Sequence, residues 1–140
     1  MVRYRRRWRD RDLWIAVSRL TRQVLAFVVG DRSRKSLRTL WSRVPPAYRR
    51  KLIYTDEYEV YASFFRPWQH RPSPKGSGRT SVAEGLNNKW RNRLAALVRR
   101  TVCMRYEAEL VRRLRLVFDQ HNRLCRRRIE HLGWHNLSMP

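Results

Sequence analysis

Residues 52–56, Leu-Ile-Tyr-Thr-Asp, form a short apolar run that ends in a carboxylate. The β-branched and aromatic side chains of this run predict a strand, with Asp56 at its carboxyl end. In open α/β sheets, ligands bind beyond the carboxyl ends of the strands. The stretch therefore predicts one strand of the fold and also a position where a functional side chain is expected.

Two further β-prone runs precede this strand. Leu13–Val17 and Val24–Val29 flank a plausible turn at Ser18–Thr21, and Gly30 ends the second run. The pattern predicts an antiparallel hairpin. Because both runs are continuously apolar rather than alternating, we expect the hairpin to be buried on both faces.

Helical spacing of apolar residues marks the remaining elements. The predicted helices are one capped by Ser33 and ended by Pro45-Pro46, one over Tyr58–Phe65, one that begins at Ser81, and one over Leu110–His121. A Pro-, Gly- and Ser-rich loop occupies residues 66–80, and a basic tail is expected after residue 122. Strands, a helix, a strand ending in Asp and then helices indicate a mixed α/β fold.

The composition limits the class of partner. The chain has 140 residues, enough for one domain, and it carries 33 Lys and Arg against 11 Asp and Glu, a net charge of +22. Six Trp and six Tyr indicate a folded body rather than a disordered basic tail. The expected partner is a polyanion, with DNA or RNA first and an acidic membrane surface second.

The sequence argues against secretion and against insertion in a membrane. Apolar runs such as Val24–Val29 are far shorter than the roughly 20 residues of a spanning helix. The basic N-terminus lacks the apolar segment of a signal peptide. Cys103 and Cys125 have neither disulfide nor zinc-site spacing and are interpreted as reduced thiols, which fits a cytosolic location.

Two of the few carboxylates stand out. Asp56 ends the strand described above, and Glu84 lies at the beginning of the helix that starts at Ser81. Carboxylate oxygens are ligands for Mg²⁺, and phosphate is the natural partner of the surrounding charge. The alternative is structural. Asp56 with Glu59, and Ser81 with Glu84, have the spacing of helix caps, and either acid could instead pair with a nearby arginine.

Basic and aromatic residues suggest where nucleic acid would bind. Lys75, Arg79, Arg91 and Arg93 are expected to contact phosphate, and an exposed Trp68 would stack on a base. The alternative for each cation is a solvated basic face. His70 and His121 are isolated, and we interpret both as structural histidines rather than catalytic ones.

From about Trp14 to Asn122 the chain resembles the catalytic domain of the insertion-sequence-one family of transposases. The matching stretches, in order and without gaps, are Ala26–Ser33, Leu40-Trp41, Pro46–Arg50, Tyr54–Asp56, Tyr61-Ala62, His70-Arg71, Lys75, Gly78, Thr80, Glu84, Asn87-Asn88, Arg91, Arg93–Ala95, Leu97–Arg99, Thr101, Leu114–Leu116 and His121-Asn122. No single short motif is diagnostic, and the specificity comes from the number of ordered matches.

The resemblance implies an RNase-H-like fold with three αβα layers and a mixed sheet, in which three carboxylates hold two Mg²⁺ ions. These ions would serve hydrolysis and transesterification of DNA phosphodiesters. Asp56 matches the second acid and Glu84 the third. Asn87 and Asn88 join the expected DNA-binding residues. The expected organisation is a basic arm over residues 1–12, a partial catalytic domain over 13–122 and a basic tail over 123–140.

The chain departs from the family at three positions. The first family Asp aligns just upstream of Met1, while Asp12 falls in the register of the neighbouring strand. Val82 stands where the family has His, and Gly85 stands where it has Arg. We therefore expect a sheet without its central first strand, and a chain that is truncated, inactive and poorly folded by itself. An upstream transposase segment or a second copy would have to supply the missing group.

Three functions remain open at this point. The first is a transposase of an insertion sequence, acting on transposon ends and target DNA in the prokaryotic cytoplasm, in association with the nucleoid. The second is a non-catalytic, basic DNA-binding protein derived from a transposase fragment. A ribosome-associated basic protein is the third, which the charge permits but the α/β order and the acids disfavour.

Overall fold

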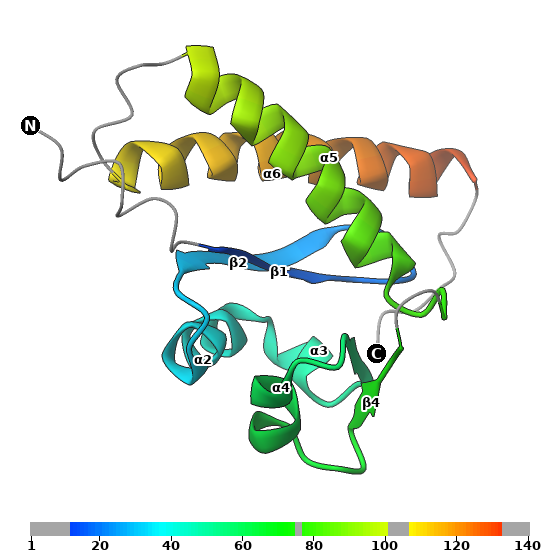
Figure 1. Cartoon of the computed structure of the whole chain (residues 1–140). Helices are drawn as coiled ribbons and strands as arrows, with labels where there is room; N and C mark the ends of the chain where they lie inside the picture. Colours follow the sequence, from blue (N-terminus) through cyan, green and yellow to red (C-terminus); the bar gives the residue numbers. More distant parts are fainter. Residues whose placement is uncertain (1–11, 75–76, 101–106, 133–140) are drawn as a thin grey trace, which may run out of the picture. The chain divides into compact units, whose positions relative to one another are not determined.

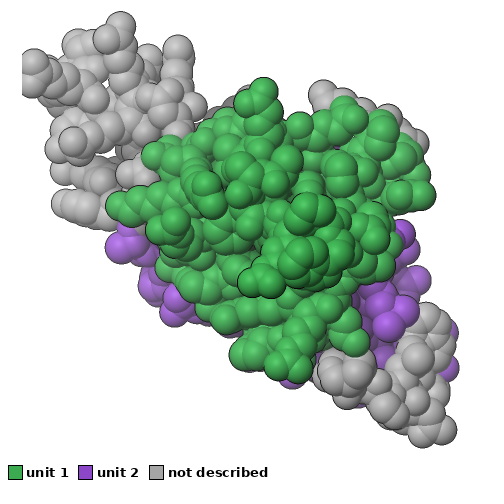
Figure 2. Space-filling view, turned by 90° about the horizontal axis from the view of Figure 1, so that it is seen from below, with its two compact units in different colours: residues 1–16, 25–81 green, residues 17–24, 82–140 purple. Residues whose placement is uncertain are grey.

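The computed structural model describes residues 12–74, 77–100 and 107–132. Two compact units are distinguished, Met1–Ala16 with Leu25–Ser81 and Val17–Val24 with Val82–Pro140 (Figure 2). The first unit contains the short strand that precedes Asp56, and the second contains the two longest described helices (Figure 1).

The predicted hairpin is confirmed. Strand β1 (Asp12–Val17) pairs with β2 (Val24–Gly30) in a two-stranded sheet. In the turn, Arg22 has a φ of 60°, and Ser18 N–H donates to the Gln23 carbonyl at 2.9 Å. Burial on both faces is wrong, because buried and half-buried side chains alternate along β2. Successive side chains of a strand point to opposite faces, and here only one face is fully buried.

The buried face of β2 is covered by helix α2 (Arg34–Arg43), which Ser33 caps as predicted by accepting a hydrogen bond from Ser36 N–H. Leu37 is only 1% exposed. The core of this unit comprises Trp14, Ala26, Val28, Leu37, Leu40, Val44 and Phe65. Strand and helix approach so closely at Gly30 that an added Cβ would lie 2.4 Å from Ser36 Oγ.

The rest of the first unit holds four short elements. They are α3 (Pro46–Arg49), β3 (Ile53–Thr55), α4 (Glu59–Phe64) and β4 (His70–Pro72). The helix break at Pro45-Pro46 is confirmed, although Pro46 also begins α3, as proline at a first helical position often does. Strand β4 lies inside the segment expected to be a loop. It pairs in parallel with β3, with Ile53 opposite His70 and Thr55 opposite Pro72.

The second unit is built from α5 (Ser81–Arg100) and α6 (Glu107–His131). Trp90 packs edge-on against Phe118, with ring centres 5.4 Å apart. Asn122 of α6 joins the start of β2 by accepting from Val24 N–H and donating to the Val24 carbonyl, each at 2.8 Å. Helix α6 continues to His131, so much of the segment expected as a basic tail is helical. Arginine is a good helix former, which allows this extension.

The α/β class is confirmed, since helices accompany two small sheets, β1 with β2 and β3 with β4. Within residues 12–74, 77–100 and 107–132, no single mixed sheet joins the four strands. No helix in this part of the chain combines the length and the apolar character needed to cross a membrane. Cys125 is a free thiol, as predicted, and Cys103 lies outside the described residues.

Candidate functional site

Asp56 directly follows β3, as the sequence predicts, and its side chain is exposed. One carboxylate oxygen accepts a hydrogen bond from Tyr58 N–H at 3.2 Å. Helix α4 begins only at Glu59, with Tyr58 in the N-cap position, so the proposal that Asp56 caps this helix is wrong. The carboxylate orders the turn between β3 and α4, and its exposed oxygens remain accessible to a ligand.

A hydrogen-bond relay fixes the backbone at Asp56. Thr55 Oγ1 donates to the Asp56 carbonyl at 2.8 Å and lies 2.6 Å from His70 Nε2. A hydroxyl has one proton, so Thr55 accepts from a protonated Nε2 when it donates to Asp56. His70 is buried, and burial lowers its pKa, with a further contribution from Arg71. The histidine thus has the structural role predicted for it.

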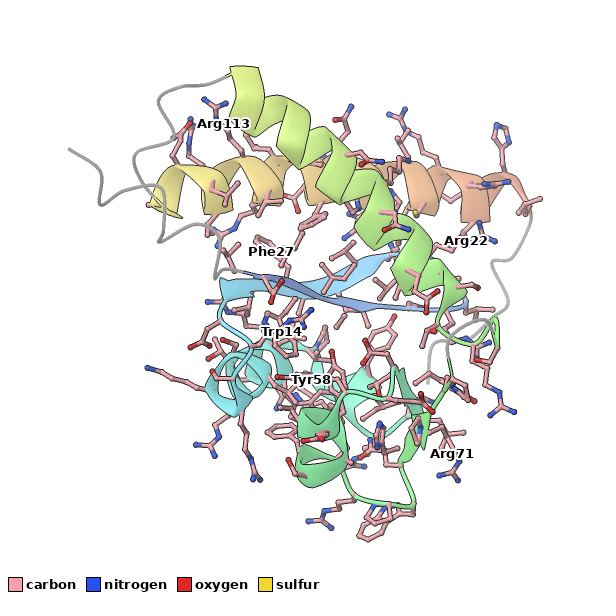
Figure 3. The ribbon with its side chains drawn as sticks, in the orientation of Figure 1. Trp14, Arg22, Phe27, Tyr58, Arg71 and Arg113 are labelled. Atoms are coloured by element: carbon pink, nitrogen blue, oxygen red, sulfur yellow. The ribbon has the colours of Figure 1, made fainter. Side chains whose placement is uncertain are left out.

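Aromatic residues and one arginine lie near Asp56. Burial is the main cause that raises the pKa of Tyr61, and the charge of Asp56 is the second. Arg32 places its guanidinium 5.8 Å from the ring centre of Tyr58, and its carbonyl accepts from the Tyr58 hydroxyl at 2.8 Å. The ring centres of Trp14 and Tyr58 are 6.5 Å apart. Both residues lie on the same side of the hairpin (Figure 3).

Asp12 has a partner of its own. Its carboxylate accepts from Arg32 Nε at 2.8 Å, in an ion pair whose side chains are 33% and 69% exposed. Arg32 therefore connects the beginning of β1 with the turn that carries Tyr58. The carboxylate of Asp12 is thus paired with a cation, whereas that of Asp56 accepts a backbone hydrogen bond from Tyr58.

Glu84 lies in the first turn of α5 and is exposed. Ser81 is the first residue of this helix, and its hydroxyl donates to the Gly78 carbonyl at 2.8 Å. A carboxylate in the first helical turn is favoured by the helix dipole whether or not it binds a metal. Nothing lies within 4 Å of a Cβ built on Gly85, so no close contact at this position requires glycine.

The oxygen donors of Asp56 and Glu84 suit Mg²⁺, which prefers carboxylates and retains several waters. Asp56 belongs to the first unit and Glu84 to the second. In the part of the chain that the structure describes, no group of three or more His, Cys, Asp or Glu side chains is arranged to hold a metal ion. Each of the two carboxylates, taken by itself, has the oxygen donors of a magnesium ligand.

The expected DNA-binding residues are only partly described. Arg79 and Asn88 are exposed, and Asn88 follows Glu84 by one helical turn on α5. Lys75 lies outside the described residues. The backbone at Asn87, Arg91 and Arg93 belongs to α5, and their side chains lie outside the described part.

Trp68 is exposed, as the sequence predicts, at 66% of its surface. The guanidinium of Arg66 lies over its ring, 5.1 Å from the centre. Sequence reasoning missed Arg32, whose approach to Tyr58 and Asp12 depends on how the strands and helices pack. The only signal for it is its position directly after β2, beside Gly30 and Asp31.

Comparison with protein families shows that the IS1 transposase family matches residues 3–125. The match includes Asp56, Glu84 and nearly all of the described structure. Comparisons with curated proteins and with solved structures find no match. The family match covers far more than half of the 140 residues, and it agrees with the ordered resemblance and with the position of Asp56 after β3. The chain belongs to the IS1 transposase family.

Proposed function

We propose that the chain contributes to Mg²⁺-dependent hydrolysis and strand transfer at DNA phosphodiesters, with Asp56 and Glu84 as metal-binding carboxylates. The observation that carries the proposal is an exposed carboxylate that follows β3 in a chain of this family. Bound metal ions would activate the attacking oxygen and stabilise the leaving one. The family's DDE chemistry and RNase-H-like fold are part of the proposal.

The chain's own residues would position and neutralise DNA. The net charge of +22 attracts the phosphate backbone. Arg79 and Asn88, both exposed, and Lys75, Asn87, Arg91 and Arg93 are proposed to contact the DNA backbone. The relay from His70 through Thr55 to the Asp56 carbonyl would hold the acid in place, as partners of ligand residues commonly do.

We further propose that two acids do not suffice, and that the chain by itself is inactive. The division of the described strands into two separate sheets supports this proposal, because a sheet without its central strand would divide in this way. A third carboxylate from another transposase segment or from a second copy would complete the site.

Metal binding can be tested apart from catalysis. Fe²⁺ bound in place of Mg²⁺ reduces added hydrogen peroxide to hydroxyl radicals, with ascorbate to regenerate the Fe²⁺, and these radicals cleave the nearby backbone. We expect cleavage beside residues 56 and 84. Asp56→Asn should abolish the cut at 56, while Glu57→Gln, a change at the adjacent exposed acid, should leave it. If the cut at residue 56 is as strong in Asp56→Asn as in the wild type, the carboxylate of Asp56 is ruled out as a metal ligand.

Nicking of supercoiled plasmid in Mg²⁺ tests the catalytic part. We expect none from the 140-residue chain alone. Cleavage that depends on Asp56 would show that the chain is active alone, and cleavage unchanged by Asp56→Asn and Glu84→Gln would show that the assigned acids are wrong.

The alternative is a non-catalytic DNA-binding protein. The net charge of +22 favours it, because binding of phosphate by the cations needs no metal site. This alternative predicts DNA binding without radical cleavage at residue 56.

A further inference from the structure

The loop between α4 and β4 presents an aromatic side chain to solvent. Trp68 is 66% exposed, the largest value among the exposed large hydrophobic residues of the described chain. Phe65, three residues earlier, is 9% exposed and belongs to the core. Burying a tryptophan stabilises a fold, so an indole directed outward beside a buried phenylalanine suggests a binding surface.

The backbone of this loop is held by hydrogen bonds. Gln69 and His70 both donate their N–H groups to the Arg66 carbonyl at 3.0 Å. The Gln69 side chain donates to the carbonyls of Arg49 and Lys51, and the main-chain carbonyl of Gln69 accepts from Ile53 N–H at 2.9 Å. Trp68 is therefore presented by an ordered turn, so little backbone entropy would be lost when a ligand binds.

The surroundings of Trp68 are cationic. Arg66 lies over the indole at 5.1 Å, and Arg71 donates to the Pro67 carbonyl at 3.1 Å, which holds its exposed side chain against the same turn. Figure 3 shows Arg71 on β4. Residues 60–83 contain no Asp or Glu. An exposed indole with one guanidinium over its ring, and a second bonded to the carbonyl of the preceding residue, suits a ligand that is both planar and anionic.

We propose that Trp68 stacks on an unpaired base of single-stranded DNA, with Arg66 and Arg71 on the flanking phosphates. A base in a duplex is already stacked on its neighbours, so the site selects unpaired or frayed DNA. Cations around the indole favour this ligand over an apolar protein surface, which would leave the guanidinium groups unpaired. The same chemistry admits any base, because every base has a π face.

The inference goes beyond the proposed strand transfer and does not depend on the metal site. Trp68 precedes β4, whereas Asp56 follows β3, and the two strands are parallel. The residues thus lie toward opposite ends of this small sheet, whose three-residue strands span roughly 10 Å. A DNA strand bound along this sheet would have one base stacked on Trp68 at one end of the sheet and would pass Asp56 at the other end.

The test measures fluorescence anisotropy of labelled 20-nucleotide DNA with the 140-residue chain in EDTA, so that metal chemistry plays no part. Trp68→Leu should weaken single-strand binding about 5-fold to 150-fold, the range for loss of one base–aromatic stack. Trp68→Phe, which keeps an aromatic face, should lose much less. Leu116→Ala, at a residue 60% exposed on α6, is a matched control that should have no effect.

An abasic strand identifies the contact. It lacks the stacking partner, so Trp68→Leu should have no effect on its binding if the indole stacks on bases. An equal loss on abasic and normal strands, or an equal loss on duplex and single-stranded DNA, would overturn the proposal. Circular dichroism of both Trp68 variants should match the wild type, and Trp68→Phe gives a second result if the leucine variant does not fold.

Discussion

His70 Nε2 lies 2.6 Å from Thr55 Oγ1, and the same hydroxyl donates to the Asp56 carbonyl at 2.8 Å. The contact joins the two strands of the parallel pair and continues directly to the residue proposed to bind metal. A change of charge on the imidazole therefore affects the end of β3 that carries Asp56. This relationship leads to the first of four predictions.

Acidification should destabilise the protein through His70. Burial lowers its folded pKa below the ordinary value of 6.5, so the unfolded state binds the proton more tightly. The contribution to stability is complete above pH 6.5 and is lost as the pH falls through the folded pKa. Urea unfolding between pH 5 and 8 should show this decline, and His70→Gln should reduce its slope. The interpretation fails if the variant and the wild type decline in parallel.

Asp56→Asn should separate function from stability. The side chain is exposed and accepts one hydrogen bond at 3.2 Å, so the free energy of unfolding should change by no more than about 0.5 kcal/mol. Loss of a residue that supports a metal ligand lowers metal affinity roughly 10- to 100-fold. Loss of the ligand itself should lower the metal affinity by more than that. Thermal melting and Mn²⁺ titration give the two values. A large loss of stability with unchanged Mn²⁺ affinity would make Asp56 a purely structural residue.

Asn122→Leu should destabilise the second unit. The substitution removes both hydrogen bonds to Val24, a residue that is 6% exposed, and leaves its N–H and carbonyl without these partners. The expected cost is about 1–3 kcal/mol for each unsatisfied group, measured as a shift of the urea midpoint. Asn88→Leu, at an exposed position of α5, is the control and should change stability by less than about 0.5 kcal/mol. Equal effects of the two changes would contradict this role of Asn122.

Replacement by alanine should change the stability of the protein in opposite directions at Gly85 and at Gly30. Gly85 lies inside α5, just after its first turn, with open space where a Cβ would be, so Gly85→Ala should stabilise the helix by up to about 1 kcal/mol. At Gly30 the new Cβ would lie 2.4 Å from Ser36 Oγ, which already donates to Asp31 at 2.8 Å, so Gly30→Ala should destabilise. Thermal unfolding of the two variants measures both effects. If Gly30→Ala stabilises the protein instead, β2 and α2 can move apart easily to make room for the new methyl group.

Local signals in the sequence were sufficient for much of the fold. Ser33 followed by apolar residues at helical spacing predicts α2 with its cap, because the cap and the buried stripe are both encoded within a few turns. The position of Asp56 after a strand is predicted in the same way. Neither needs knowledge of distant contacts.

Other features depend on contacts that a linear pattern does not encode. Strand β4 is three residues long, ends in Pro72 and forms only because β3 lies beside it. One face of β2 is only half-buried because of what covers that face in the folded protein. A continuous apolar run in the sequence does not say which elements will cover each face. The approach of Arg32 to Asp12 and Tyr58 brings together three segments far apart in the sequence.

The pairing of Asn122 with Val24 has a consequence for association between copies. A side-chain amide that engages both the N–H and the carbonyl of one residue imitates the contact that a neighbouring strand would make. Open strand edges recruit other chains and lead to aggregation. A single amide on α6 thus occupies the backbone groups of Val24 at the start of β2, and a strand from another chain could not pair with Val24 while these hydrogen bonds are in place.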